Sequence, residues 1–328
     1  MSVLIVGGAG YIGSQTAKCI ARAGHPLVVL DNLVHGHRWA VKWGTLVKGD
    51  LSDAALVERV LVEHRVTSVI HFAAYAYVGE SVENPRKYFR NNGANTLNLL
   101  DAMVDCGVPH IVFSSTCATY GEPREVPIRE SHPQHPVSPY GESKLAVERI
   151  LHWYSRAYSI RHAALRYFNA AGADPEGEIG EDHDPETHLI PLAIRAAFDG
   201  KSELSIYGTD YPTPDGTAIR DYIHVADLAE AHRLALEHLG RGGDNLQLNL
   251  GTGRGHSVRE VIAAVESVSG RRVSVREAGR RAGDPPVLVA DARRAEEVLR
   301  WRPMYPGIDA IVRHACVWHE RRRRAPDS

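Results

Sequence analysis

The first half of the chain alternates short, continuously apolar runs with longer amphipathic segments. The apolar runs are rich in Val, Ile and Leu and are too short for helices, which is typical of strands buried on both faces. They lie at residues 3–6, 27–30, 45–47, 68–72, 111–114 and 162–167. Helical periodicity separates most of them, notably at residues 11–23, 54–64, 95–106 and 140–158. This alternation predicts an α/β fold with a doubly wound parallel sheet.

The pattern changes after about residue 169. Residues 172–185 and 208–216 are rich in Gly, Pro and acidic residues without periodicity, which is typical of loops. Helical and strand patterns return over residues 225–250. We therefore expect a first domain at residues 1–169, to which about 225–250 also belong. The remainder of 170–328 is expected to form a smaller, discontinuous α/β domain that builds a pocket over the sheet.

Composition and charge exclude several classes of protein. The chain has 328 residues, of which 44% are hydrophobic, and this apolar fraction excludes a disordered chain. Its formal net charge of −2, from 38 basic and 40 acidic side chains, argues against a partner among nucleic acids. No apolar run approaches the roughly 18 residues of a membrane span, and no secretion signal is recognisable. We expect a cytoplasmic protein without a membrane partner.

The cysteines, the histidines and the basic tail add little chemistry at this stage. The four cysteines are far apart and form no Cys-x-x-Cys pair, so neither a zinc ribbon nor a disulfide framework is predicted. His132 and His135 lie among prolines and are interpreted as part of a loop, so no metal site is expected. The basic run at 321–324 follows the last apolar pattern and is predicted to be a solvated end without function.

A glycine motif follows the first predicted strand and opens the first predicted helix. Gly7, Gly10 and Gly13 have the Gly-x-x-Gly-x-x-Gly spacing. Such a turn lets the backbone approach a pyrophosphate, which the helix N-terminus then holds. Asp31 ends the second strand, where a carboxylate accepts hydrogen bonds from ribose hydroxyls and repels a 2′-phosphate. The sequence therefore predicts a Rossmann-type dinucleotide site for NAD rather than NADP.

Two further segments lie at predicted strand ends, where ligands of open α/β sheets bind. Asp50 follows the third strand, and Phe72, Ala73 and Ala74 follow the fourth. Asp50 is placed to touch the adenine end of a dinucleotide. Both segments are equally compatible with an ordinary cap or turn.

Tyr140 and Lys144 lie four residues apart at the start of a predicted helix, so their side chains share one face. A lysine ammonium about 4 Å from a phenol favours the phenolate by about 4 kcal/mol at an effective dielectric near 20. That equals roughly three pKa units before any opposing desolvation, which general base chemistry near pH 7 requires. A surface helix pair has the same spacing. The hydroxyls of Ser114, Ser115 and Thr116 at a nearby strand end favour the catalytic interpretation.

These residues resemble the extended short-chain dehydrogenase/reductase superfamily. Longer signatures are similar to those of UDP-glucose (UDP-galactose) 4-epimerases, and they run in order from Val3 to about Trp318. They are His71-Phe72-Ala73-Ala74, Val78-Gly79-Glu80-Ser81, Tyr140-Gly141-Glu142-Ser143-Lys144, Arg166-Tyr167-Phe168-Asn169, Gly208-Thr209-Asp210-Tyr211 and Arg220-Asp221-Tyr222-Ile223-His224.

The resemblance implies a tightly held NAD that is used and restored within each turnover. It implies that Tyr140 takes the proton of the sugar 4-hydroxyl, that Thr116 shuttles this proton and that Lys144 holds the nicotinamide ribose. The cofactor residues that it implies, with those of the motif, are Gly7, Gly10, Tyr11, Ile12, Gly13, Asp31, Asn32, Asp50, Leu51, Phe72, Ala73, Ala74, Asn91, Ser114, Tyr140, Lys144, Tyr167 and Phe168. The implied substrate residues are Thr116, Tyr140, Asn169, His188, Leu189, Ser205, Tyr207, Arg220, Arg281, Asp284 and Leu288.

Several positions depart from the pattern of the resembled family. Ala76 stands where some members have a lysine near the cofactor, and His188 replaces an asparagine used on the diphosphate side. Leu288 occupies the gate of the sugar pocket and is intermediate in size between the tyrosine and the small residues found there. Residues 74–78 and 115–119 are also similar to segments of epimerases that act on UDP-pentoses (UDP-xylose and UDP-arabinose). UDP-pentoses and UDP-N-acetylhexosamines therefore stay open as alternative substrates of a 4-epimerase.

Two other activities fit less well. A sugar-nucleotide dehydratase needs acidic groups after the catalytic threonine, whereas Thr116 is followed by Cys117 and Ala118. A non-catalytic NAD-binding sensor is the remaining alternative, and the intact Thr116, Tyr140 and Lys144 argue against it. The resemblance also implies a homodimer paired through the helix that carries Tyr140. The apolar Leu145, Val147, Ile150 and Leu151 of that helix fit either a dimer contact or packing on its own sheet.

Overall fold

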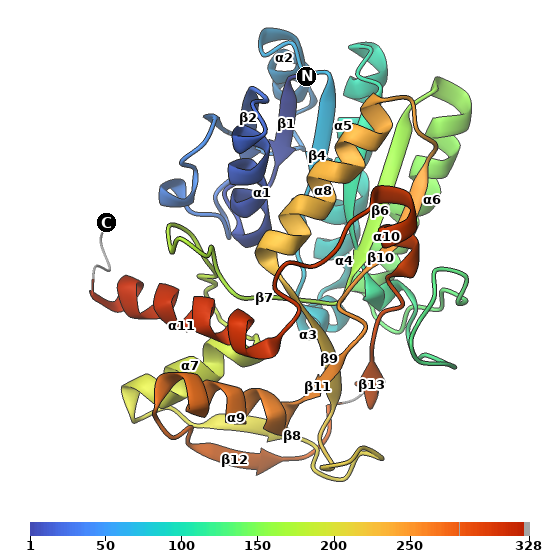
Figure 1. Ribbon diagram of the computed structural model, residues 1–328. Helices are drawn as coiled ribbons and strands as arrows, with labels where there is room; N and C mark the ends of the chain where they lie inside the picture. Colours follow the sequence, from blue (N-terminus) through green and yellow to red (C-terminus); the bar gives the residue numbers. More distant parts are fainter. Residues whose placement is uncertain (282, 325–328) are drawn as a thin grey trace.

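The computed structural model describes residues 1–281 and 283–324 and contains a large parallel sheet with helices on both faces (Figure 1). The sheet has the strand order β10-β6-β5-β4-β1-β2-β3, and every neighbouring pair is parallel. Its strands are β1 (Val3–Val6), β2 (Leu27–Asp31), β3 (Thr45–Lys48), β4 (Ser68–His71), β5 (His110–Thr116), β6 (Arg161–Tyr167) and β10 (Leu246–Leu250). The predicted doubly wound α/β fold is confirmed.

Two apolar cores lie on the two faces of this sheet. One core joins the sheet to α2 (Ala54–Glu63), α5 (Asn95–Asp105) and α6 (Pro139–Tyr158). The other joins it to α1 (Tyr11–Arg22), α8 (Val225–Gly240) and α10 (Arg293–Leu299). Burial on both faces explains why the strands read as continuous apolar runs rather than as alternating ones.

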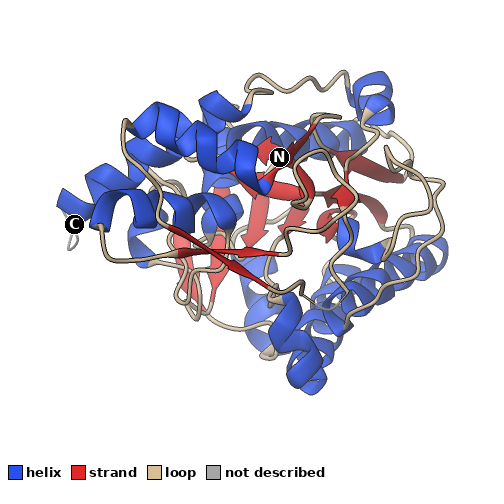
Figure 2. Cartoon of the chain, turned by 90° about the horizontal axis from the view of Figure 1, so that it is seen from below, coloured by secondary structure: helices blue, strands red, loops and turns tan. Residues whose placement is uncertain are grey.

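A smaller part carries its own core around α7, α9 and α11. In the view from below, several helices gather near the C-terminus (Figure 2). Strand β9 pairs with β7, β11 and β13, and β8 pairs with β12. The bounds are β7 (Asn169–Ala171), α7 (Leu189–Asp199), β8 (Leu204–Tyr207), β9 (Ile219–His224), β11 (Gly255–Ser257), α9 (Val258–Ser269), β12 (Val275–Ala278), β13 (Val287–Leu288) and α11 (Ile308–Arg324). Short helices complete the chain: η1 (Arg38–Ala40), α3 (Val78–Glu83), α4 (Pro85–Tyr88), η2 (Phe89–Ala94) and η3 (Cys117–Thr119).

The chain crosses between the two parts more than once. After β9 it returns to the large sheet through α8 and β10, and after β13 it returns again through α10. Trp301, which follows α10, is buried on the sheet side and donates its indole N–H to the carbonyl of Asp227 at 2.9 Å. The sequence did not indicate this second return.

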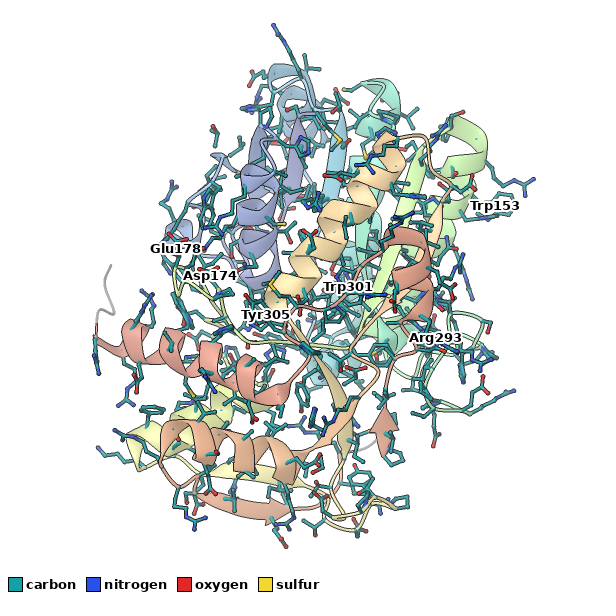
Figure 3. The ribbon with its side chains drawn as sticks, viewed as in Figure 1. Trp153, Asp174, Glu178, Arg293, Trp301 and Tyr305 are labelled. Carbon is teal, nitrogen blue, oxygen red and sulfur yellow. The ribbon has the colours of Figure 1, made fainter. Side chains whose placement is uncertain are left out.

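The basic end of the chain differs from the expected solvated end, and the burial of α6 fits one of the two expected arrangements. Residues 321–324 continue α11 rather than forming a loose tail, and Arg321 donates to the carbonyl of Glu176 at 2.7 Å. The α6 side chains Leu145, Val147 and Leu151 are buried within this chain, whereas Trp153 of the same helix is 64% exposed and points away from it (Figure 3).

None of the helices over the described ranges 1–281 and 283–324 is long and apolar enough to cross a membrane. All four cysteines are free thiols.

Candidate active site

A cavity of about 490 Å³ lies at the carboxyl ends of the large sheet's strands, and residues of the smaller part close it. All the cofactor residues expected from the sequence line it, from Gly7 to Phe168. So do Thr116, Asn169, His188, Arg220, Asp284 and Leu288 of the expected substrate residues. Leu189, Ser205, Tyr207 and Arg281 are not among its lining residues. The fold thus gathers most of the expected residues around one space, while the role of each stays a prediction.

The glycine turn between β1 and α1 forms the floor of this cavity. Gly7 has a φ of +79°, and a Cβ there would lie 2.6 Å from the Ala73 backbone nitrogen. A Cβ on Gly13 would lie 2.2 Å from the carbonyl oxygen of Gly7. Gly10 caps α1 without a side-chain hydrogen bond, so the first N–H groups of the helix stay available to an anion. The turn therefore fits a diphosphate.

Two carboxylates stand at the ends of neighbouring strands in the cavity. Asp31 accepts hydrogen bonds from the backbone N–H of Ala9 at 2.9 Å and of Leu33 at 2.8 Å. Burial raises the pKa of Asp31, and these two bonds oppose the rise. Asp50 accepts from the Asn32 amide at 2.6 Å and from the N–H of Ser52 at 2.9 Å, so it also serves its own turn.

Tyr140 and Lys144 are positioned by the start of α6. Ser138 caps the helix by accepting from the N–H of Gly141 at 3.2 Å, and Pro139 occupies the first turn. Lys144 Nζ donates to the carbonyl of Ser114 at 2.8 Å. Burial lowers the pKa of Lys144 to about 7.

The expected lowering of the Tyr140 pKa is absent in the ligand-free chain. Burial raises the pKa of Tyr140, Tyr167 adds to the rise, and a hydrogen bond with Thr116 opposes it. Desolvation therefore outweighs the effect of Lys144 on the Tyr140 pKa. The Lys144 ammonium donates its hydrogen bond to the Ser114 carbonyl instead. Burial therefore disfavours the phenolate form of Tyr140 in this structure.

The hydroxyls near Tyr140 have partners of their own. Ser114 and Tyr167 share a hydrogen bond of 2.7 Å between β5 and β6. Thr116 accepts from the N–H of Ala118 at 3.1 Å, which fixes its side chain at the end of β5. Ser114, Thr116 and Tyr167 all line the cavity.

On the opposite wall, charged residues already pair with each other. Arg220 forms an ion pair with Asp284. Outside the cavity lining, Arg281 lies over the Tyr207 ring at 4.0 Å, and Ser205 accepts from Arg276 at 2.9 Å. A ligand that uses Arg281 must draw this arginine toward the cavity.

Sequence analysis missed several lining residues in the loops. Tyr75, Tyr77, Glu181 and His183 line the cavity as well. Tyr75 and Tyr77 lie between two signature segments, residues 71–74 and 78–81, and no motif spacing singles them out. Glu181 and His183 lie in a segment without periodicity, where side-chain placement depends on the loop conformation.

Comparisons with known proteins agree with this geometry. Residues 3–251 match the NAD dependent epimerase/dehydratase family. A UDP-glucose 4-epimerase of Halalkalibacterium halodurans is 49% identical over 98% of this chain and 96% of its own. The structure of UDP-glucose 4-epimerase from Brucella ovis in complex with NAD is 54% identical over 96% of this chain and 97% of its own, with a TM-score of 0.94. That of the Bifidobacterium longum enzyme with NAD+ and UDP is 38% identical over 100% and 99%, with a TM-score of 0.93. The chain therefore belongs to the NAD dependent epimerase/dehydratase family and, within it, to the UDP-glucose 4-epimerase family.

Proposed function

We propose that this protein interconverts UDP-glucose and UDP-galactose by inverting the sugar C4 through a 4-keto intermediate. The observation that carries the proposal is the meeting of Thr116, Tyr140 and Lys144 beside the glycine turn in one cavity. A hydroxyl, a phenol and an ammonium at this place supply a proton relay, a base and its electrostatic support. The family membership reported above sets the substrate class.

The residues of the sheet half fit NAD. The turn from Gly7 to Gly13 would hold the diphosphate, Asp31 the adenosine ribose and Lys144 the nicotinamide ribose. When bound, NAD supplies the acceptor and donor of the electron pair taken from C4, together with the positive charge of its oxidised ring. The buried Asp31 carboxylate is already oriented by two backbone N–H groups, so it presents fixed acceptors to hydroxyl groups.

Tyr140 would take the proton of the 4-hydroxyl and return it after the sugar has turned over. Its burial disfavours the phenolate in the ligand-free chain, which restricts the base to the loaded site. Thr116 would pass the proton between Tyr140 and the sugar oxygen. Lys144, held at the Ser114 carbonyl, would stabilise the phenolate from the cofactor side.

The smaller part would grip the UDP portion. Asn169 and Arg220 line the cavity, and the guanidinium of Arg220 suits a diphosphate because it offers a planar fork to oxyanions. Its pairing with Asp284 would be exchanged for phosphate oxygens, with Arg281 as a second cation. We propose the division of the chain on this basis, with residues 1–169 and about 225–250 holding NAD and the remainder holding the nucleotide sugar.

The first experiment tests turnover and cofactor retention together. Purified protein is incubated without added NAD with UDP-galactose, and the anomeric proton of UDP-glucose is followed by NMR. Tyr140→Phe is expected to lower kcat by on the order of 10²- to 10⁴-fold while NAD stays bound. Tyr222→Phe is the matched control, because Tyr222 is a buried tyrosine outside the cavity lining. Turnover that survives Tyr140→Phe contradicts the mechanism. Bound NAD with no turnover in the unaltered protein favours the non-catalytic sensor.

Leu288 is the position at which the sugar choice is tested. It is half-buried and packs against a small core that includes Cys117, Tyr120 and Phe168. UDP-N-acetylgalactosamine and UDP-xylose are assayed beside UDP-galactose, and the relative kcat/KM values measure which sugar this wall admits. UDP-galactose is expected to give the highest value.

We further propose a cytoplasmic homodimer. The α6 residues that first suggested a dimer contact are committed to the chain's own core, so the contact would use exposed residues of the helix such as Trp153 and Tyr158. Sedimentation equilibrium is expected to give twice the chain mass of 36.1 kDa. Trp153→Glu is expected to shift the mass to that of one chain, and an unchanged mass would place the contact elsewhere.

A further inference from the structure

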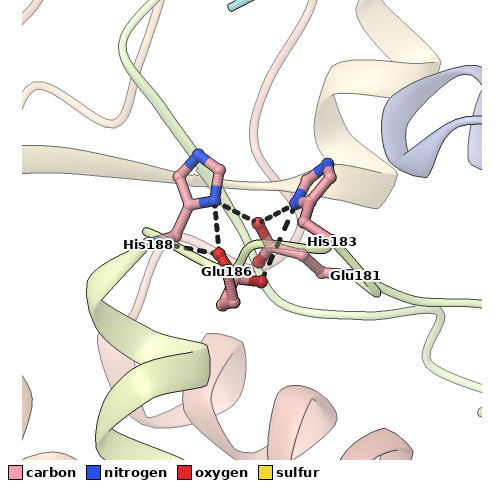
Figure 4. Close-up of side chains that lie close together, drawn as sticks. All are labelled: Glu181, His183, Glu186 and His188. Atoms are coloured by element: carbon pink, nitrogen blue, oxygen red, sulfur yellow. Dashed lines mark hydrogen bonds and ion pairs between the residues drawn. The ribbon is translucent and has the colours of Figure 1, made fainter. Parts of the chain in front are cut away.

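Four side chains with metal-binding atoms converge in the loop between β7 and α7. Glu181, His183, Glu186 and His188, here called the histidine–glutamate cluster, lie within eight residues of one another. Figure 4 shows both imidazole rings turned with one nitrogen toward the two carboxylates between them. Three of the four residues, all except Glu186, also line the cavity. No metal site was expected from the sequence, and of these four residues only His188 was named there, as a substrate residue.

The distances inside the cluster are those between ligands of one ion. His188 Nδ1 lies 2.8 Å from a carboxylate oxygen of Glu181 and 2.8 Å from one of Glu186. His183 Nδ1 lies 3.2 Å from Glu181 and 3.8 Å from Glu186. Ligands at about 2.1 Å from a tetrahedral Zn²⁺ are about 3.4 Å apart. Three of the four distances in the cluster are shorter than this ligand–ligand separation, and one is longer. Shifts of a few tenths of an ångström would complete the coordination.

Burial and outer contacts prepare the cluster for such an ion. The carboxylate side chains of Glu181 and Glu186 are only 4% and 9% exposed. Backbone N–H groups of Thr187 and His188 donate to one oxygen of Glu186 at 2.7 and 2.8 Å, which orients this carboxylate. Trp318 donates to the Glu181 carbonyl at 3.1 Å. Outer contacts of this kind fix the direction of metal ligands.

His183 carries the clearest sign of an incomplete site. Its Nδ1 is buried and close to Glu181, yet it makes no aligned hydrogen bond among the described residues. Two buried carboxylates demand about two positive charges, which are otherwise supplied by two imidazolium groups. A divalent cation supplies the same charge at a single point. Neutral imidazole nitrogens with carboxylate oxygens are ligands that Zn²⁺ accepts.

A second acidic cluster of the same loop provides the contrast. Asp174, Glu176 and Glu178 also lie within metal-binding distance of one another. There, however, Lys18 Nζ already contacts them at 2.8, 3.1 and 2.6 Å. That cluster has its cation from α1, whereas no lysine or arginine contact to the carboxylates of the histidine–glutamate cluster occurs in the described part of the chain.

We propose that the histidine–glutamate cluster binds one divalent transition metal ion, with Zn²⁺ as the best fit, and that this ion fastens the loop wall of the cavity. All four positions would be protein ligands, which is typical of a structural rather than a catalytic zinc site. The ion would hold His183 against Tyr11, whose ring lies edge-on at 6.2 Å. Tyr11 in turn donates to the Gly172 carbonyl at 2.6 Å, so the fastening reaches the first turn of α1.

The test uses the full chain without a histidine tag, freed of metal by a chelator and then titrated with ZnCl₂ against a chromophoric competitor. We expect one Zn²⁺ per chain, and with CoCl₂ the intense visible absorption of tetrahedral Co²⁺. His183→Gln and Glu186→Gln are expected to weaken binding by at least about 10- to 100-fold, because they remove ligands rather than outer contacts. Glu178→Gln is the matched control and should bind as the unaltered protein does.

Three outcomes overturn the proposal. They are absence of stoichiometric Zn²⁺ binding by the unaltered chain, absence of the tetrahedral Co²⁺ spectrum, and retention of full affinity by both variants. Far-UV circular dichroism of each variant checks that it is folded, and the unaltered protein decides the first two outcomes without any variant. Since the readout is metal binding, a failure here leaves the proposed epimerase activity untouched, and a failure of that activity leaves this proposal untouched.

Discussion

The histidines of the large sheet and those of the loop between β7 and α7 differ in the direction of their pKa shifts. Burial lowers the pKa of His71 to about 3 and of His162 to about 4. In the loop, burial would also lower the pKa, but the nearby carboxylates of Glu181 and Glu186 raise it to about 9 for His183. For His188, the charge and hydrogen bonds of the same carboxylates outweigh burial and raise it to about 10. For His183 and His188, contact with Glu181 and Glu186 therefore reverses the direction of the pKa shift that burial alone produces.

Both regions contain buried ion pairs. In the large sheet, Arg166 pairs with Glu148 at 2.6 Å. In the loop between β7 and α7, the carboxylates form ion pairs with Lys18 of α1 and with His183 and His188 of the loop itself.

The largest effect is expected for Lys18→Met. Lys18 and Asp174 are 3% and 2% exposed, so removal of the ammonium leaves a buried carboxylate without its partner. Loss of one partner of a buried pair costs about 3–5 kcal/mol. The free energy of unfolding in urea is therefore expected to fall by about that amount. Lys18→Arg is the control that keeps the charge, and a Lys18→Met protein as stable as the original would show that the loop does not depend on this cation.

A smaller effect is expected from acid acting on the sheet. His71 has a folded pKa of about 3 against about 6.5 when unfolded. The unfolded chain therefore binds the additional proton between these values, so stability falls as the pH drops below 6.5. At pH 5 the loss from His71 alone is about 2 kcal/mol. Urea unfolding at pH 5 and 7 measures it.

The matching variant is His71→Gln, which keeps an amide near the Thr96 hydroxyl that His71 contacts at 2.9 Å. Its loss of stability between pH 7 and pH 5 should be smaller than that of the unaltered chain by about 2 kcal/mol. His135→Gln is the control, because His135 is exposed. An unchanged pH dependence in His71→Gln would mean that the His71 side chain is charged in the folded protein.

The smallest effect concerns the basic end of α11. Arg321 donates to the carbonyls of Glu176 and Gly177 at 2.7 and 3.2 Å, and thus fastens the loop from outside. Because this contact is exposed to solvent, Arg321→Ala is expected to lower the free energy of unfolding by about 1 kcal/mol or less. Arg324→Ala, which removes the same charge one turn later, should change it less. Equal changes in the free energy of unfolding for the two variants would show that the Arg321 contacts add nothing and that the basic run is simply solvated.

The cofactor side of the cavity was predictable because its residues lie in short contiguous motifs. A strand, a glycine turn and a helix stand in sequence around Gly7, and Tyr140 and Lys144 share a helix face by spacing alone. In contrast, the histidine–glutamate cluster depends on how a segment without periodicity folds back, and nothing in residues 181–188 fixes that conformation locally. The raised pKa of Tyr140 could not be predicted for another reason. The spacing in the helix brings Lys144 near, but the burial that outweighs the effect of Lys144 comes from residues distant in sequence.

The return of the chain to the large sheet at β10 has a consequence for biosynthesis. Strand β10 pairs with β6 along residues 246–250, but these are made only after the whole of residues 170–245. During translation the sheet therefore waits with β6 as an open edge, and an unpaired edge strand is a template for association with other chains. Until residues 246–250 have been made, β6 therefore lacks its neighbour on that side of the sheet.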